Sequence, residues 1–302
     1  MVKNMQPTVI SLFAGCGGSS LGYKLAGYKE LLAIDFDEDS VITFKLNFPE
    51  TPIWKKDIST ITGKEIMDTC NITLGELDVL DGSPPCQGFS SAGKRKIIDK
   101  RNDLFLEFVR LILEIKPKVF IMENVSGMVY GKMKGKFKEI ILELKKTNYN
   151  VQCALLNTVN YNVPQNRKRL IFIGVRNDIR INPTFPLPSK KIITVKEAIS
   201  SLPKQIEDRQ MKEWLKIAYY KIPALCGNKK TEKIFIRYKG TSGGSINTIK
   251  LAWNKPSPTL LKSEISVSGL LHPSESRYLT ISELRRICSF PDNFIFTNRK
   301  NA

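Results

Sequence analysis

The sequence predicts an α/β fold: a doubly wound, mostly parallel sheet followed by a second, smaller irregular or β domain. Short apolar runs alternate with amphipathic segments over the first 176 residues, and a glycine-rich turn follows the first run. Beyond residue 176 the alternation stops, and Pro, Gly, Ser and Lys become more frequent. Strand–helix alternation of this kind is typical of layered α/β domains.

Each strand is predicted from a short and mostly apolar run, as expected of buried parallel strands. The runs are TVISLF (8–13), ELLAID (30–35), LDVLDG (77–82), KVFIME (118–123) and RLIFIGV (169–175). Helices are predicted over 102–116 and 134–146, because apolar residues recur there at helical spacing. These elements place the sheet within the first 176 residues.

The predicted domain boundaries separate residues 1–176, 177–276 and 277–302. The middle segment carries 17 Lys or Arg and 8 Asp or Glu. In the last segment we expect a helix to start at Thr280, because Glu283 follows three residues later, as in a capping box. We expect this segment to return towards the interface between the other two domains.

The charge balance points to a polyanionic partner. The 302 residues include 47 Lys or Arg against 29 Asp or Glu, a net charge of +18. This excess favours nucleic acid over a merely solvated basic surface. No apolar run reaches the roughly 18 residues of a membrane span, and no secretion signal opens the sequence, so we expect a cytoplasmic protein. Six scattered cysteines without C-x-x-C spacing, and a single histidine, argue against a metal site.

The stretch SLFAGCGGSSLG (11–22) combines a strand, a glycine-rich turn and a helix start. Glycines allow a sharp turn and the close approach of a ligand. Asp35 ends the next strand, where a carboxylate can accept hydrogen bonds from ribose hydroxyls. Together they predict an adenosine-containing cofactor, and Ser20 interrupts the glycine spacing of a dinucleotide site. The alternative is a tight turn without a ligand.

Two further groups follow predicted strands. Cys86 lies in SPPCQ (83–87), where Pro85 stiffens the backbone just before it. Glu123 ends another strand. Because ligands of doubly wound sheets bind outside the carboxyl ends of the strands, we expect the glycine turn, Asp35, Cys86 and Glu123 to converge on one rim. The alternatives are an inert buried thiol and a capping or ion-paired glutamate.

A basic segment follows later in the chain. Gln165, Arg167 and Arg169 recur at period two, so they share one face if the segment is extended. Two arginines on one face suit phosphate or carbonyl recognition, and the alternative is a solvated basic edge.

These motifs together resemble the DNA cytosine-5 methyltransferases of bacterial restriction–modification systems. FAGCGG, PPCQGFS, ENV, QNRKR and RYLTISELRRICSFPDNF occur in that family's order, over nearly the whole chain. The resemblance implies a Rossmann-like methyltransferase fold, with residues 1–176 as the catalytic domain that binds S-adenosyl-L-methionine and residues 177–276 as the target-recognition domain. It also implies double-stranded DNA as substrate, S-adenosyl-L-homocysteine as product and no metal.

The cofactor contacts follow from the same resemblance. Phe13 is expected to stack on the adenine, Asp35 to hold the ribose and Asp57 to contact the adenine amino group. The remaining implied contacts are Ala14, Gly15, Gly17, Gly18, Phe36, Ile58, Pro85 and Leu104.

The implied catalytic residues are Cys86 as nucleophile, Glu123 as the acid at the ring and Arg169 as a contact to the cytosine carbonyl, supported by Arg167 and Gln165. A thiolate that adds to carbon 6 makes carbon 5 nucleophilic. The target base must first leave the helix. We expect loop 88–101 to close over it, with DNA contacts from Gln87, Ser90, Lys94, Arg95, Ser245, Asn247 and Thr259.

The sequence departs from the family after FPDNF, where the family continues into a Gly-Asn-rich segment that completes the cofactor pocket. Either a second polypeptide supplies this segment or the chain is truncated by design or mutation, and a cognate restriction endonuclease is expected only as a functional link. The alternatives are a methyltransferase acting on an RNA such as transfer RNA, and a truncated, catalytically weak DNA-binding protein that needs a partner chain. A nicotinamide-dependent oxidoreductase would leave PPCQ and the basic insert unexplained.

Overall fold

The computed structural model describes residues 6–85, 104–129, 134–203, 209–225, 228–241, 248–260 and 269–297, without the side chains of 134–136 and 228–229. The chain forms two compact units. The first unit comprises Met1–Leu156 and Lys168–Pro186, and the second comprises Asn157–Arg167 and Leu187–Ala302. The chain therefore passes into the second unit for residues 157–167 and then returns to the first. The first unit ends at Pro186, ten residues beyond the predicted boundary at 176. The roles expected of the domains stay a prediction.

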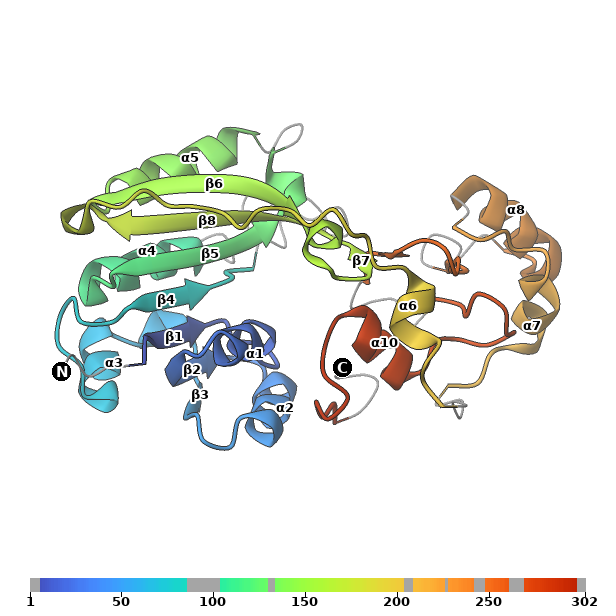
Figure 1. Cartoon of the computed structure of the whole chain (residues 1–302), viewed down its shortest axis with the longest axis horizontal. Coiled ribbons are helices and arrows are strands. Elements are labelled where there is room, and N and C mark those ends of the chain that lie inside the picture. Colours follow the sequence, from blue (N-terminus) through green and yellow to red (C-terminus); the bar gives the residue numbers. More distant parts are fainter. Residues whose placement is uncertain are drawn as a thin grey trace. The chain divides into compact units, whose positions relative to one another are not determined.

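The first unit is built on a seven-stranded sheet of order β3-β2-β1-β4-β5-β8-β6 (Figure 1). Its strands are β1 (Thr8–Leu12), β2 (Lys29–Asp35), β3 (Ile53–Lys55), β4 (Val79–Gly82), β5 (Val119–Val125), β6 (Tyr149–Asn157) and β8 (Lys168–Arg176). The pairs formed by β1 to β5 are parallel, as predicted, and the sheet is mostly parallel. The prediction of a parallel strand over 169–175 was wrong, because β8 pairs with β5 in the antiparallel direction.

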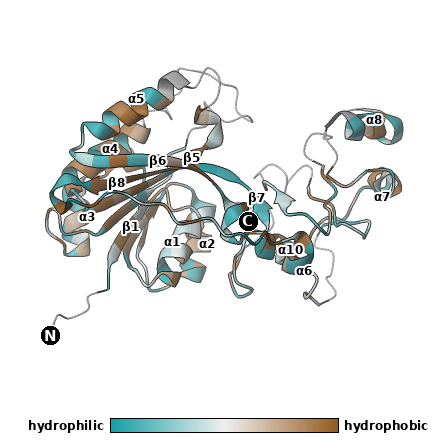
Figure 2. Cartoon of the chain, turned by 45° about the horizontal axis from the view of Figure 1, so that its top comes forward, coloured by the Kyte–Doolittle hydropathy of each residue, from teal (hydrophilic) through white to brown (hydrophobic). Residues whose placement is uncertain are grey.

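Helices flank this sheet. They are α1 (Gly18–Leu25), α2 (Glu38–Asn47), α3 (Gly63–Cys70), α4 (Leu104–Ile115) and α5 (Lys134–Lys145), with short 3₁₀ turns η1 (Ile58–Thr60), η3 (Ser126–Val129) and η6 (Asn177–Ile179). The apolar face of α4 packs with the strands in one core cluster that includes Phe108, Ile112 and Phe120. Figure 2 shows hydrophobic residues along β1 and β8. No helix in the described ranges is long and apolar enough to cross a membrane.

The second unit contains more helix than the irregular or β domain that the sequence predicted. It carries η5 (Thr158–Tyr161), β7 (Gln165–Asn166), α6 (Val195–Ile199), α7 (Glu213–Tyr219), α8 (Asn228–Lys239), β9 (Ser257–Pro258) and α10 (Ile281–Ile287). One core cluster joins residues of α6 and α10, and another joins residues of α7 and α8. Several of these helices are short, so their periodic patterns are weak among the surrounding Pro, Gly and Ser.

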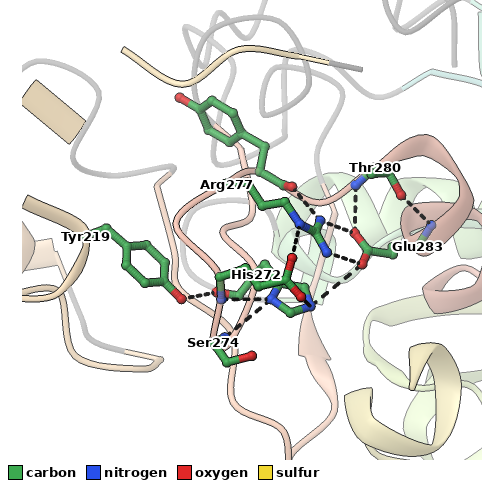
Figure 3. A network of polar contacts seen from close by, with 8 residues as sticks. Tyr219, His272, Ser274, Arg277, Thr280 and Glu283 are labelled. Carbon is green, nitrogen blue, oxygen red and sulfur yellow. Dashed lines mark hydrogen bonds and ion pairs between the residues drawn. The ribbon is translucent and has the colours of Figure 1, made fainter. Parts of the chain in front are cut away.

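A buried polar network holds the start of α10 (Figure 3). Thr280 caps the helix and forms the predicted capping box with Glu283. The Glu283 carboxylate also accepts two hydrogen bonds at 2.8 Å from Arg277. The His272 carbonyl accepts a hydrogen bond from the Tyr219 hydroxyl at 2.7 Å. The network therefore ties α7 to the segment that leads into α10.

Candidate active site

Four neighbouring strands of the first unit are in register at one rim of the sheet. Leu12 of β1 pairs with Ile34 of β2 and with Gly82 of β4, which pairs in turn with Met122 of β5. The next residue of each strand therefore stands in one row, and these residues are Phe13, Asp35, Ser83 and Glu123. The predicted convergence is confirmed for the start of the glycine turn, Asp35 and Glu123.

The backbone at this rim adopts a strained and tight turn. Phe13 lies in the left-handed region with φ 57°, an unfavourable conformation for a residue with a side chain that occurs often at functional sites. Gly17 has φ 93°, and a Cβ there would lie 2.3 Å from the Phe48 ring. Apart from Gly15 and its two chain neighbours, no described residue has an atom within 4 Å of the position that a Cβ on Gly15 would take. The turn is thus packed on one side at Gly17 and open at Gly15.

Asp35 fixes this turn from the neighbouring strand. Its carboxylate accepts hydrogen bonds from the backbone N–H of Gly15 at 2.7 Å and of Asp37 at 2.8 Å. A carboxylate offers about four lone-pair sites, so Asp35 retains capacity for ribose hydroxyls. Phe36 follows it, and its side chain is 74% exposed.

Other predicted cofactor residues have visible local roles. Asp57 is exposed, caps η1 and accepts hydrogen bonds from Ser59. Ile58 is buried in the core, and Leu104 starts α4 and packs partly against the same core. The remaining predicted contacts border the two turns and are Ala14, Gly18 and Pro85.

The sequence analysis missed Arg110 of α4, which holds the loop between Asp57 and Gly63. Its guanidinium donates to the carbonyls of Ile58 at 3.2 Å and Ile61 at 2.9 Å, and it pairs with Glu107 and Glu114. In the sequence, Glu107 and Glu114 stand three and four residues from Arg110, a spacing that is typical of ion pairs on the surface of a helix and says nothing about the loop.

Glu123 and Arg169 are brought together by strand pairing. Glu123 of β5 lies opposite Ile171 of β8, and Arg169 is two residues away along β8, which makes it a diagonal neighbour on the same face. The Arg169 guanidinium and the Glu123 carboxylate form an ion pair. Since Glu123 is the last residue of the row at the rim, the ion pair extends that row from β5 to β8.

Gln165 and Arg167 belong to the second unit, whereas Arg169 belongs to the first. The condition for a shared face is not met at Arg167, because its backbone N–H donates to the Gln165 carbonyl at 3.2 Å and the residue lies between the strands β7 and β8. Thr259, which follows β9, donates to the Asn166 carbonyl at 2.7 Å. Thr259 thus lies beside the Gln165–Arg167 segment.

Several predicted residues lie outside the described residues. They are Cys86, the predicted nucleophile, the loop 88–101, and the DNA contacts Gln87, Ser90, Lys94, Arg95, Ser245 and Asn247. The approach to Cys86 is described as far as Pro85, and the Ser83 hydroxyl lies 3.5 Å from the Phe13 carbonyl oxygen. Within the described ranges, no group of three or more His, Cys, Asp or Glu could hold a metal ion.

Comparison with known proteins assigns this geometry to a family. The model of the C-5 cytosine-specific DNA methylases matches residues 7–302. The chain belongs to this family. It is 32% identical to the type II methyltransferase M.XorII of Xanthomonas oryzae, over 96% of the chain and 78% of that protein. It is 34% identical to M1.HphI of Haemophilus parahaemolyticus, over 100% of the chain and 82% of that protein.

Solved structures agree with this assignment. An E. coli prophage protein described as a DNA modification methyltransferase shares 26% identity with a TM-score of 0.73, over 96% of this chain and 90% of that one. DNMT2 of Spodoptera frugiperda, at 19% identity and a TM-score of 0.63 over 98% and 96% of the two chains, shows the fold alone. The Rossmann-like methyltransferase fold is confirmed, and this C-5 cytosine DNA methylase is an enzyme whose family implies S-adenosyl-L-methionine as methyl donor.

Proposed function

We propose that this methylase transfers a methyl group to carbon 5 of a cytosine flipped out of double-stranded DNA, through a covalent bond between Cys86 and carbon 6. The observation that carries the proposal is the row formed by Phe13, Asp35, Ser83 and Glu123 at one rim. This row joins a cofactor turn, the approach to the nucleophile and an acid on adjacent strands. S-adenosyl-L-methionine, when bound, supplies a methyl group activated by its sulfonium.

Asp35 and Phe36 offer the cofactor two complementary contacts. The Asp35 carboxylate can accept from the ribose hydroxyls while it holds Gly15, and the exposed Phe36 ring can stack on the adenine. Phe13 is half-buried and packs partly against the core, so it is expected to present only part of its ring. Asp57 remains the proposed partner of the adenine amino group.

The reaction requires the Cys86 thiolate to add to carbon 6 of the cytosine. The new sulfur–carbon bond breaks the ring double bond, negative charge develops towards ring nitrogen 3, and carbon 5 becomes nucleophilic. A protonated Glu123 can donate to nitrogen 3 and stabilise that charge. After the methyl group has bonded to carbon 5, a base removes the carbon-5 proton, the double bond re-forms and the thiolate leaves.

The Glu123–Arg169 ion pair must separate when the flipped cytosine enters the site. An ionised carboxylate only accepts hydrogen bonds, so Glu123 has to take up a proton before it can donate to nitrogen 3. Arg169 is then free to donate to the cytosine carbonyl. In the complex, nitrogen 3 of the cytosine would then be the partner of Glu123, and the cytosine carbonyl would be the partner of Arg169.

The second unit supplies the proposed surface for reading DNA. Most exposed side chains of α7 and α8 that carry charge are basic, among them Lys216, Lys230, Lys233 and Arg237. Cations on this surface can neutralise phosphates, and Thr259 lies next to the proposed catalytic segment. The second polypeptide and the cognate endonuclease stay predictions.

A duplex that contains 5-fluorocytosine tests the proposal, because fluorine cannot leave carbon 5 as a proton does. Incubation with S-adenosyl-L-methionine should give a denaturation-resistant protein–DNA adduct on a long duplex of varied sequence. Cys86→Ser should give none, and the matched control Cys153→Ser, altered in β6, should trap DNA as the unchanged protein does.

Two results would contradict the proposal. A folded protein that traps no duplex DNA in the presence of cofactor would exclude the covalent route. Trapping of 5-fluorocytosine RNA in place of the duplex would instead support an RNA methyltransferase.

A further inference from the structure

A carboxyl group is buried beneath the glycine turn. Asp81 lies in β4, five residues before Cys86, and only 8% of it is exposed. It pairs in register with Ser11 of β1. Its side chain accepts hydrogen bonds from the Tyr23 hydroxyl at 3.2 Å and from Ser19, both in α1. One carboxyl group thus connects the strand that leads to Cys86 with the helix that follows the glycine turn.

The start of α1 depends on such a contact. Gly17 is the N-cap residue, and no side chain makes a capping hydrogen bond there. Ser19 lies in the first turn of α1, and Tyr23 lies one turn further along. Both side chains reach Asp81, so they hold the helix against β4 from two successive turns. Since Gly15 and Gly17 directly precede α1, a shift of the helix would move the cofactor turn as well.

The carboxyl group is costly to keep at this position. Burial, together with the charges of Glu30 and Glu123, raises the pKa of Asp81 to about 7, although the hydrogen bonds from Tyr23 and Ser19 oppose this rise. Glu30 of β2 is itself bonded to Ser20 of α1 at 2.8 Å, and burial raises its pKa too. A buried carboxyl group with hydroxyl partners adds little to packing, and such groups are concentrated near functional sites.

We propose that Asp81 is a positioning residue, which holds the glycine turn in its cofactor-binding form by anchoring α1 to β4 through Tyr23 and Ser19. This inference rests on the proposed function, because it assigns the glycine turn to S-adenosyl-L-methionine. Asp81 acts through the helix and does not itself contact the cofactor. Loss of the Asp81 carboxyl group or of the Tyr23 hydroxyl group should therefore weaken cofactor binding. The rate of the chemical step at saturating cofactor should be retained.

The test compares three variants of the full chain by calorimetric titration with S-adenosyl-L-methionine. Tyr23→Phe removes one hydroxyl and keeps the ring, so the hydrogen bond to Asp81 is lost and the dissociation constant should rise about tenfold. Asp81→Asn keeps the shape of the carboxyl group and an oxygen that can still accept from Tyr23, so it exchanges an ionisable acceptor for a neutral one and should raise the dissociation constant by a smaller factor. Tyr28→Phe is the matched control, because its ring packs against Tyr23 with centroids 5.4 Å apart; it should bind within about twofold of the unchanged protein.

Kinetics and a double variant complete the test. Tyr23→Phe should raise the KM for the cofactor about tenfold and change kcat less than about threefold, and Tyr23→Phe with Asp81→Asn should weaken binding no more than the stronger single change. Unchanged dissociation constants in both single variants would overturn the inference, and Tyr23→Phe decides alone if Asp81→Asn does not fold. If the unchanged protein binds no S-adenosyl-L-methionine, the proposed function fails first.

Discussion

The two units bury their acidic groups in opposite ways. Asp81 in the first unit meets the hydroxyl groups of Tyr23 and Ser19, whereas Glu283 in the second unit meets the guanidinium of Arg277 at 2.8 Å. Burial raises the pKa of Asp81 to about 7. Burial disfavours the charged form of Arg277, but its hydrogen bonds to Glu283 and Glu275 outweigh this and raise its pKa. One unit therefore holds a carboxyl group that titrates near neutral pH, and the other holds an arginine that stays charged.

The two kinds of partner suit the different roles of the two regions. The Arg277–Glu283 pair fixes the start of α10, and Glu283 also forms the capping box with Thr280, so no step of the proposed function requires the pair to separate. Asp81 lies beside a turn that has to accept and release a ligand under the proposed function. A guanidinium holds a carboxylate more tightly than hydroxyl groups do, because it adds a full positive charge and two parallel hydrogen bonds.

The largest effect is expected from breaking the pair in the second unit. Arg277→Met leaves Glu283 buried at 3% exposure without its guanidinium. Removal of one partner from a buried ion pair costs about 3–5 kcal/mol, because the remaining charge is uncompensated. The free energy of unfolding, measured with urea and followed by tryptophan fluorescence, should fall by that amount.

The control for this prediction is a more exposed arginine pair in the same unit. Arg286 bonds to Asp292 at 2.5 Å, and the Asp292 side chain is 54% exposed. Arg286→Met should cost less than about 1 kcal/mol, as surface ion pairs do. Equal losses for the two substitutions would show that burial does not distinguish the pairs.

A smaller, pH-dependent effect is expected from Asp81. Its folded pKa of about 7 lies above the ordinary 3.8, so its protonated form favours the folded state below about pH 4, and this contribution is lost as pH rises through 7. Asp81→Asn removes the titration. The unfolding free energy of the variant minus that of the unchanged protein should therefore be about 2–4 kcal/mol larger at pH 8 than at pH 4.

Urea unfolding at several pH values measures this difference. Asp68→Asn makes the same substitution at an exposed carboxyl group in α3 and serves as the matched control. A pH-independent difference for Asp81→Asn would mean that Asp81 does not titrate in this range, and the contrast between the units would then be lost.

Sequence patterns predicted the elements that single residues or short runs determine. The apolar runs predicted β1, β2, β4 and β5, and the spacing of Thr280 and Glu283 predicted the start of α10, because these signals are local. The direction of β8 was missed, since an apolar run specifies burial and not the direction of pairing. β6 was missed because YNVQCALLN alternates polar and apolar residues and is only partly buried.

The site was predictable to the extent that it lies at strand ends. Asp35 and Glu123 were found because a doubly wound sheet brings the carboxyl ends of its strands to one rim. Asp81 and Arg110 were not, because their roles arise from contacts with α1 and with the η1 loop that are distant in sequence. The Glu123–Arg169 pair likewise depends on the antiparallel register of β5 and β8.

The smallest effect concerns His272, whose ring lies in the second unit's network and titrates in the opposite sense to Asp81. Burial and the neighbouring charge of Arg277 lower its pKa, and Glu283 and Glu275 only partly oppose this. Its Nδ1 also accepts the Glu275 backbone N–H at 3.0 Å, a hydrogen bond that protonation of Nδ1 would remove. The contribution of neutral His272 is therefore present above the unfolded pKa of 6.5 and is lost as pH falls.

Because His272 is the single histidine of the chain, proton NMR of the imidazole can follow it without assignment. The titration midpoint in the folded protein should lie below 6.5, and in 8 M urea it should return to the ordinary value. Arg277→Met should move the folded midpoint upward, since the remaining neighbours Glu275 and Glu283 favour the protonated ring. A folded midpoint at or above 6.5 would mean that acid does not weaken the second unit through this residue, and the opposite pH responses of the two units would reduce to that of Asp81 alone.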